Sequence, residues 1–576
     1  MTEQEYLQKI HELEKQVLRL QTELKKNSET QYGLRWMDVP EAFEAEAENA
    51  IPTLEEVPDK AISNDDGKPT HILIEGDNFH ALTCLNYTHK GTIDVIYIDP
   101  PYNTGDDFIY KDKRILDKYP DGSIVPADHP LRHSYWLSFM HKRLELAKNL
   151  LSKRGVIFIS INKSEFAQLK LLCDEIFLER NFIGHLTWES TTQPTNAGLA
   201  KYGLQQKAES ILMYAKSKDK ISGFNLKYTE KQLTYPNMGK FGPCRLEIIE
   251  KSDAGSYNRE SMKFPILGVY PRKGKRWQIG QETADELVNR GRIEIVDGVV
   301  KKAVYPEDEE DKISYEPFWS HLTSEEVGTA QKGKDDLNTI MGRPVGFDTV
   351  KPISLISKLL FHTTTSISTI LDFFAGSGTT MHATMQLNEE DGGHRQCILV
   401  QQNENNICEA VTYERNKRVM QGYTNAKGEA VAGLGNSMKY YRTAFVGEHK
   451  ITDITDADKV ALTQKAGCLL ALGENTLEEI KTAKSYQIFQ LRKGDKPTND
   501  FGYTAVYFSG NLLQFADFRR EIEQIQAANP LTRIAVYVFT WGDPSIFENE
   551  FDDLSGITIK PIPQPILEIY QNIHQL

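Results

Sequence analysis

The sequence is poor in cysteine, with six in 576 residues, and these six lie far apart along the chain. No two of them form a CxxC pair, and none has a histidine beside it at the spacing of zinc ligands. We therefore expect reduced, structural thiols, with neither a disulfide framework nor a metal site.

Long apolar runs are also missing. No window reaches the roughly 18 consecutive apolar residues that cross a membrane. The opening stretch, MTEQEYLQKIHELEK, is charged where a signal peptide needs an apolar core. With 40% hydrophobic and 26% charged residues, we expect a soluble, cytoplasmic protein of about two to four domains with no membrane partner.

An overall positive charge is absent, because the formal net charge is −14. Residues 201–280 are an exception, with 16 Lys and Arg against 7 Asp and Glu. One basic segment in an acidic protein fits a local grip on DNA, although a solvated basic surface would have the same composition. The best candidates for phosphate contacts in this segment are Arg272, Lys273, Lys275 and Arg276.

The N-terminal segment has a heptad-like pattern. Between Tyr6 and Leu24, apolar residues recur at alternating spacings of four and three. This predicts a coiled-coil helix within residues 1–31. Such a short coiled coil is marginal alone, so it either joins two copies of the chain or lies against its own domain.

Strand and helix patterns alternate after this segment. The stretch HILIEGDNFHAL (71–82) predicts a strand, a turn and a helix, and later apolar runs continue the rhythm. This predicts an α/β fold with a parallel sheet covered on both faces. The rhythm breaks near residue 190 and resumes near residue 336. The expected domains are therefore an α/β domain in two parts, residues 32–190 and 336–440, an insertion at 191–335, and a separate small α/β domain at 441–576. We expect this last domain to contribute to dimerisation or to contact a partner.

A glycine-rich stretch, ILDFFAGSGTTMHA (370–383), predicts a strand, a loop and a helix. Small residues there let the backbone approach a ligand at the helix N-terminus. The dinucleotide fingerprint is incomplete, because Met381 stands at its third glycine. The next strand ends on Gln401, close to Glu404, where a hydroxyl-binding acid would be expected for a ribose. A nucleoside without a pyrophosphate would fit this pattern.

The stretch GTAQKGKD (328–335) matches the GxxxxGK pattern of a nucleoside-triphosphate loop. However, Asp335 stands where that loop needs Ser or Thr, and no apolar strand comes before it. The sequence therefore has no credible triphosphate loop, and it has no nuclease motif either. A restriction activity would need another polypeptide.

The run DVIYID (94–99) predicts a buried strand that ends on a carboxylate, followed by Pro100, Pro101 and Tyr102. Ligands bind at the carboxyl edge of a parallel sheet. The prolines make a stiff turn without backbone donors, which leaves carbonyl acceptors beside Asp99. Two acceptors draw both hydrogens of an exocyclic amine and return its lone pair to nitrogen, while Tyr102 offers a flat face to an extruded base. We interpret this tetrad as an amine activator with a base clamp; a plain surface turn would not need the apolar strand.

The order IDPPYNTG then LDFFAGSGTT resembles the β-class adenine-specific DNA methyltransferases. With YGLRW, IEGDNFHAL, WLSFMHKRLELAKNLL, VGTAQKGKDDL and YERNKRV, the resemblance over roughly residues 32–425 is to the modification (Mod) subunit of type III restriction–modification systems. It implies a Rossmann-like methyltransferase sheet with an inserted target-recognition domain at 191–335. It also implies S-adenosylmethionine as the methyl donor and N6-methyladenine in double-stranded DNA as the product. We further expect a homodimer and a restriction (helicase–nuclease) subunit as a partner.

Two alternatives remain open at this point. The same amine chemistry would serve N4-cytosine methylation. The chain could also act mainly as a recognition subunit that places a helicase–nuclease on DNA.

The resemblance also assigns residues to roles. The catalytic motif is Asp99, Pro100, Pro101 and Tyr102. The cofactor-binding residues are Asp77, Asn78, Lys351, Pro352, Asp372, Phe374, Ala375, Gly376, Ser377, Gly378, Thr379 and Gln401. Lys351 and Pro352 are expected at the methionine end of the cofactor. Gln401 stands where related enzymes often have an acid, so the ribose contact is expected among Gln401, Asn403 and Glu404. Ala208 and Asn162 depart from the usual histidine and aspartate, away from the catalytic motif.

Overall fold

The protein is described by a computed structural model. It covers residues 34, 36–39, 41, 50–104, 114–115, 118, 123–126, 129–194, 198, 201–229, 234–254, 259–309, 314–347, 349–425, 427–509, 514–541, 547 and 549–574. The predicted coiled coil at 1–31 lies outside these residues. The chain divides into two compact units, one formed by Met1–Asn225 with Trp319–Leu576 and the other by Leu226–Phe318.

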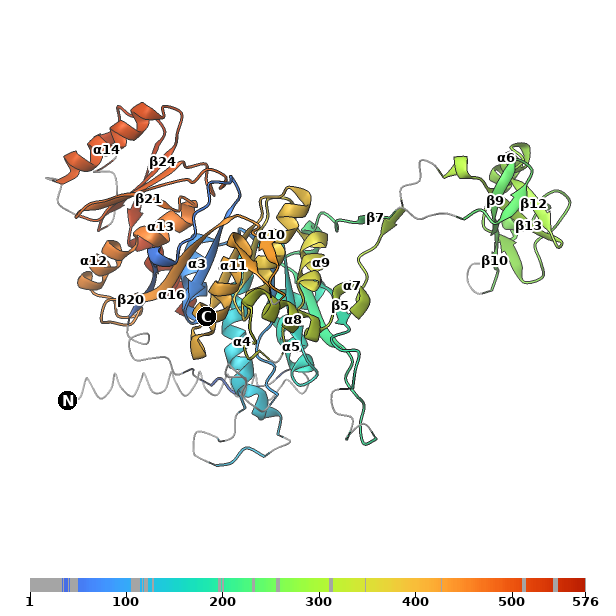
Figure 1. The fold of residues 1–576 in the computed structure, drawn as a ribbon, viewed down its shortest axis with the longest axis horizontal. Coiled ribbons are helices and arrows are strands. Elements are labelled where there is room, and N and C mark those ends of the chain that lie inside the picture. Colours follow the sequence, from blue (N-terminus) through green and yellow to red (C-terminus); the bar gives the residue numbers. More distant parts are fainter. Residues whose placement is uncertain are drawn as a thin grey trace, which may run out of the picture. The chain divides into compact units, whose positions relative to one another are not determined.

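Ten of the described strands form one sheet in the first unit (Figure 1). In spatial order they are β1 (Ile51–Glu56), β20 (Ser437–Val446), β2 (Thr70–Glu75), β17 (Gln396–Gln401), β16 (Thr369–Asp372), β3 (Ile93–Ile98), β4 (Leu151–Ile161), β6 (Glu209–Ala215), β5 (Phe182–Trp188) and β15 (His321–Leu322). The strands from β20 to β4 are parallel, as predicted, whereas β1 and β6 pair antiparallel with their neighbours. Apolar runs such as IDVIYI in β3 are buried along their length because helices cover both faces of such a sheet.

The helices that connect the parallel strands show which edge of the sheet is expected to bind ligands. The chain runs from β2 through α3 (Asn78–Thr88) to β3 in one direction along the sheet, and from β16 through α10 (Thr379–Asp391) to β17 in the other. Right-handed crossovers therefore put α3 and α10 on opposite faces. The direction of winding changes between β16 and β3, and ligands bind at such a switch point, beyond the carboxyl ends of the strands.

The remaining helices extend these two layers. On the α3 side lie α4 (Ser134–Leu150) and α5 (Phe166–Cys173), and α10 packs against α9 (Ile353–Thr363) and α11 (Glu414–Gln421). The short α7 (Ser324–Val327) leads into α8 (Ala330–Met341), which packs on α11. Among the described residues, no helix is long and apolar enough to span a membrane.

The second unit is smaller than the predicted insertion. It holds a sheet of β12 (Ile293–Val296), β13 (Val299–Val304), β9 (Gly242–Ile248) and β8 (Asn237–Gly239), the hairpin of β10 (Glu250–Ser252) with β11 (Lys275–Trp277), the ribbon of β7 (Lys227–Thr229) with β14 (Ser314–Glu316), and helix α6 (Gln281–Asn289). The predicted bounds 191 and 335 are therefore too wide. The flanking parts belong to the first unit, because β6, β15 and α8 complete its sheet and helical layer.

The C-terminal region is not the separate domain that was predicted. The proposed boundary at 440 falls inside β20, which pairs with both β1 and β2 in the main sheet. Beyond it, a five-stranded sheet joins β21 (Glu478–Thr482), β22 (Tyr486–Gln490), β23 (Tyr503–Tyr507), β24 (Ile534–Phe539) and β25 (Ile557–Ile562). With it lie α12 (Asp456–Lys465), α13 (Gly467–Glu474), α14 (Phe515–Ala528) and α16 (Gln564–His574). Both α13 and α16 pack on α3, so this region shares the apolar core of the first unit.

Candidate active site

The tetrad Asp99–Tyr102 follows β3 at the predicted edge of the sheet. The first acceptor, Asp99, keeps about a third of its side chain exposed (33%). Contrary to expectation, the Pro101 carbonyl is not open, because it accepts a hydrogen bond of 2.7 Å from Trp136 Nε1. The Pro100 carbonyl has no hydrogen-bond partner among the residues that the structure describes. Asp99 and Pro100 are therefore the two acceptors of the tetrad.

Both oxygens of Asp99 already have partners. Its Oδ2 lies 2.8 Å from Lys351 Nζ, and its Oδ1 accepts a hydrogen bond of 2.7 Å from the Tyr102 hydroxyl. Burial and the nearby carboxylate of Asp99 raise the pKa of Tyr102 well above its usual value, so this hydroxyl stays protonated and donates. Any group that binds to this carboxylate must therefore exchange with these donors.

A second carboxylate, Glu209, was missed by the sequence analysis. It is the first residue of β6, and its Oε2 lies 3.0 Å from the Tyr102 hydroxyl and 3.3 Å from Lys351 Nζ. Burial opposes the charge of Lys351, but Asp99 and Glu209 outweigh it and raise the pKa of this lysine. The only signal in the sequence was a glutamate that opens an otherwise apolar strand.

Lys351 is placed by a close backbone contact. It stands just before α9, and its neighbour Val350 passes over Gly333 in α8. A Cβ on Gly333 would lie 2.2 Å from the Val350 carbonyl oxygen, so no larger residue fits there. The glycine of the false triphosphate motif thus has a structural purpose, because it lets the segment with Lys351 reach Asp99.

The glycine loop takes the predicted form between β16 and α10. Gly376 and Gly378 have φ values of +50° and +77°, which favour glycine. A Cβ on Gly378 would also lie 2.4 Å from Asn416 Nδ2. The buried Arg415 holds the loop from α11, with Nη1 at 3.0 Å from Ser377 Oγ and 2.7 Å from Thr379 Oγ1. Arg415 lies in the YERNKRV stretch, but no role was predicted for it.

Asp372 fixes the start of the same loop. Its carboxylate accepts hydrogen bonds from the Phe374 amide (3.0 Å) and the Thr380 hydroxyl (2.6 Å). Burial raises its pKa to about 7, although the two hydrogen bonds act in the opposite direction. Asp372 is therefore a loop anchor that is partly protonated near neutral pH.

One cavity joins these parts, and all of its lining belongs to the first unit. The predicted residues along its wall are Asp77, Asn78, Asp99, Pro101, Lys351, Asp372, Phe374, Ala375, Gly376, Ser377, Thr379 and Gln401. Pro100, Tyr102, Pro352 and Gly378 are not part of the lining, although Tyr102 contacts Asp99. The wall also includes Tyr97, Arg114, Phe139, Phe347, Val350, Glu404 and Ile407, none of which was predicted as a cofactor-binding residue except Glu404 as an alternative to Gln401.

The three candidates for a ribose contact differ in position. Gln401 lines the cavity, but its Oε1 accepts a hydrogen bond of 2.7 Å from the Gly376 amide, so it braces the glycine loop. Asn403 is outside the lining, and its Oδ1 accepts from the Glu409 amide. Glu404 is the carboxylate on this side of the cavity. Of the three candidates, Glu404 is the one that brings a carboxylate to the lining of the cavity.

The turn after β2 is held against the glycine loop. The Asn78 side chain donates a hydrogen bond of 2.9 Å to the Phe373 carbonyl, and Asp77 caps α3 by accepting from the Phe79 amide. The buried Arg143 of α4 contacts both Asp77 and Asn78. These contacts bring the two predicted cofactor segments to one end of the cavity.

The predicted basic cluster lies in the second unit, with Lys275 and Arg276 in β11 and with Arg272 and Lys273 in the turn that leads into this strand. Arg272 is tied to Glu250, with Nε 2.7 Å from Oε2. Lys251 and Arg276 stand directly opposite each other on the two strands. Like charges in this position destabilise a hairpin, so an anionic partner would relieve them. Lys251 was not among the predicted residues.

A family model described as DNA methylase matches residues 93–424. This is more than half of the chain, and the chain belongs to the DNA methylase family.

Individual relatives show which DNA methylases the chain is similar to. The type III restriction-modification enzyme StyLTI Mod subunit of Salmonella typhimurium is 33% identical over 359 residues, which cover 58% of this chain and 53% of the relative. The EcoPI Mod subunit of Escherichia phage P1 is 31% identical over 387 residues, or 58% of each chain. The chain thus spans little more than half the length of these two relatives. The type II methyltransferase M.KpnI of Klebsiella pneumoniae is 31% identical over 412 residues, which cover 67% of this chain and 93% of that protein.

Proposed function

We propose that the chain is the modification subunit of a type III restriction–modification system and transfers a methyl group from S-adenosylmethionine to N6 of adenine in double-stranded DNA. The observation that supports this most directly is the pair of acceptors at the end of β3, with a tyrosine beside them. Asp99 lines the cavity and is partly exposed, and the Pro100 carbonyl has no partner among the described residues.

The cavity fits S-adenosylmethionine in its chemistry. The glycine loop leaves its backbone accessible at the N-terminus of α10, and the wall offers apolar faces from Phe347, Phe374 and Ile407. Glu404 would hold the ribose hydroxyl groups, and Asp77 and Asn78 would meet the adenine end. When bound, this cofactor supplies a methyl group on a positively charged sulfur.

The residues of the site act on the amine that receives the methyl group. Asp99 and the Pro100 carbonyl accept its two hydrogens, which localises the lone pair on nitrogen. This lone pair forms the new bond to the methyl carbon while the carbon–sulfur bond breaks and its electrons stay on sulfur. The methylated nitrogen then releases one hydrogen as a proton to Asp99, from which it passes to water. Tyr102 presents its ring to the flipped base.

The charges of the site suit this transfer. Asp99 and Glu209 carry two negative charges against one positive charge on Lys351, so the cluster has a net charge of −1. During the transfer, positive charge moves from the sulfur onto the amine beside Asp99. A fixed excess of negative charge stabilises that change without reorganisation. Glu209 also gives Lys351 and Tyr102 a second partner when the amine displaces them from Asp99.

The inserted unit Leu226–Phe318 is the proposed target-recognition domain, and the basic residues on and beside β10 and β11 are the proposed contact to DNA phosphates. A base flipped from duplex DNA needs the flanking duplex to be held. The proposed substrate is cellular DNA, which agrees with the expected cytoplasmic location. A homodimer through the N-terminal segment completes the proposed assembly.

Sequencing that detects methylated bases, on DNA from cells that express only this chain, tests the reaction. We expect N6-methyladenine on one strand of a single short site, and none with Asp99→Ala. N4-methylcytosine instead would overturn the choice of base. Unmodified DNA, from a protein shown to bind both DNA and S-adenosylmethionine, would contradict the reaction itself.

A second candidate is a methyltransferase that acts without a restriction partner. One observation favours this candidate. The match covers 93% of M.KpnI but only 53% of the StyLTI Mod subunit. Co-expression with a type III restriction subunit separates the two. We expect a stable complex that cleaves unmodified DNA; methylation with no complex would favour the second candidate.

A further inference from the structure

Helix α9 extends from Lys351, in the candidate active site, to the chain that enters the inserted unit. Lys351 comes just before its N-terminus, and its C-terminal end lies at Thr363. Eleven residues of helix extend roughly 16 Å. The chain leaves the first unit at Asn225 and returns to it at Trp319. Both of these connections are fastened to α9.

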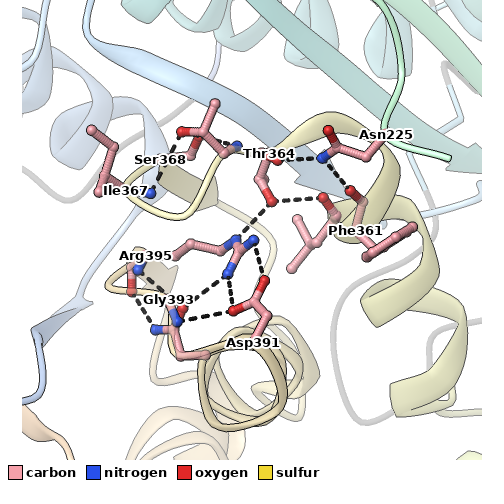
Figure 2. Close-up of polar contacts among 11 residues, drawn as sticks. Asn225, Phe361, Thr364, Ile367, Ser368, Asp391, Gly393 and Arg395 are labelled. Atoms are coloured by element: carbon pink, nitrogen blue, oxygen red, sulfur yellow. Dashed lines mark hydrogen bonds and ion pairs between the residues drawn. The ribbon is translucent and has the colours of Figure 1, made fainter. Parts of the chain in front are cut away.

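Asn225 forms hydrogen bonds with the C-terminal end of the helix (Figure 2). Its Nδ2 donates hydrogen bonds of 2.7 Å to the carbonyls of both Phe361 and Thr364. Its backbone amide donates to the His362 carbonyl at 2.9 Å, and its own carbonyl lies 2.6 Å from His362 Nδ1. Helix C-termini leave carbonyls without helical partners, and a single asparagine satisfies several of them here.

The turn that Asn225 grips is itself immobilised (Figure 2). The buried Arg395 donates from Nε to the Thr364 hydroxyl at 2.8 Å and pairs with both carboxylate oxygens of Asp391, at 2.9 and 2.7 Å. Thr364 is thus tied to the end of α10 and to the start of β17. The anchor point of Asn225 is a fixed part of the core.

The returning connection is fastened to the other part of the helix. Ser354, in the first turn of α9, donates a hydrogen bond of 2.6 Å to the Val327 carbonyl in α7. Lys358, one turn further on, forms an ion pair with Glu326. The entering and the returning chain therefore both contact the helix that follows Lys351.

We propose that Asn225 is a positioning residue for methyl transfer, which holds α9 so that Lys351 stays on Asp99 and Glu209. This rests on the proposed function and extends it, because the segment that leads into the target-recognition unit then also sets the position of Lys351. Ser354 ties the same helix to the returning connection through its hydrogen bond to the Val327 carbonyl.

The variant Asn225→Asp tests the proposal. It keeps the shape of the side chain but replaces the donor to two carbonyls by an acceptor. We expect DNA and S-adenosylmethionine to bind with less than twofold change in affinity, and the single-turnover rate of methylation to fall about five- to tenfold. Hydrogen exchange of the amides at 360–364 should accelerate, and Lys351 should react faster with an amine-modifying reagent, as read by mass spectrometry.

Lys220→Ala, an exposed change five positions earlier, serves as the matched control and should leave every readout unchanged. Faster exchange at 360–364 with an unaltered rate and unaltered labelling of Lys351 would overturn the proposal. If Asn225→Asp no longer binds the cofactor because it fails to fold, Ser354→Ala decides by the same measurements. An inactive wild-type protein that binds DNA would contradict the proposed function, whereas active wild type with an equally active Asn225→Asp contradicts only this inference.

Discussion

Lys351 and Asp99 form an ion pair of 2.8 Å across 252 positions of the chain. The carboxylate that is proposed to receive the amine is therefore occupied by a buried cation. Such a pair holds the carboxylate in one orientation, and removing Asp99 would leave the buried charge of Lys351 unpaired unless a third group takes over. Glu209 is that third group, because it also contacts Lys351.

We predict that Asp99→Ala lowers the single-turnover rate of methylation by at least about a hundredfold, since it removes the acceptor that activates the amine. Binding of S-adenosylmethionine, measured by calorimetry, should change little, because the glycine loop does not depend on Asp99. The fold should persist as well, since Lys351 keeps Glu209 as its partner. Turnover close to that of wild type would show that the tetrad has another purpose.

Glu209→Gln should slow methylation by about ten- to a hundredfold, because the net charge of the cluster rises from −1 to zero while the shape is kept. The affinity for DNA should stay the same, so that the change falls on kcat rather than KM. The exposed Glu179→Gln on the same unit is the matched control. Equal effects of both variants would mean that Glu209 acts only through general surface charge.

Local patterns predicted the two loops correctly, because each follows from a few adjacent residues. The strand before Asp99 and the glycines at 376 and 378 have local signatures, and both lie where they were expected. Glu209 could not be found in this way, because its role depends on β6 returning antiparallel beside β4. The pairing of strands that are distant in sequence has no local signal.

The errors in the domain boundaries have the same origin. The irregular composition after residue 190 suggested an insertion, yet β6 lies within that stretch and belongs to the main sheet. Likewise, β20 was divided at 440, although it pairs with β1 and β2 over most of its length. In both cases the strand pattern is visible in the sequence, but its partner is not.

Asp372→Asn should raise the free energy of unfolding above that of wild type, and this gain should be larger at pH 8 than at pH 5. The folded protein keeps a proton on Asp372 up to about pH 7, whereas an unfolded aspartate releases it near about pH 4. Between these values the folded state binds more protons, so the stability of wild type falls as pH rises. Asparagine removes this loss, which we expect to be about 2–4 kcal/mol. Urea unfolding at both pH values gives the difference; equal pH dependence of the two proteins would contradict the raised pKa.

The N-terminal segment is predicted to form a dimer contact. A chain that begins at Ser28 should then have a lower mass by light scattering than the full chain at the same micromolar concentration. Removing residues after 440 is not a useful comparison, because it would cut β20 and uncover the core beneath α13 and α16. A full chain that is monomeric and still methylates DNA would leave residues 1–31 as a brace on their own domain.

The β10–β11 turn is predicted to contact DNA phosphates. Replacing Lys251, Lys273, Lys275 and Arg276 by alanine should weaken binding to specific and random duplexes alike. Each lost phosphate contact should lower the slope of log affinity against log salt by about one unit. We expect these contacts because none of the three lysines has an ion-pair partner among the described residues, so that their charges are available to phosphates.

Arg272→Ala is the matched comparison for this turn. Its guanidinium already pairs with Glu250, so the salt slope should change less than for any one of the three lysines. The variant should instead lower the stability of the hairpin, because the nearly buried Glu250 loses its cation. Fluorescence anisotropy of a labelled duplex between low and moderate salt measures both cases. An unchanged slope in the fourfold variant would show that the turn is only a solvated surface, and that the inserted unit contacts DNA elsewhere.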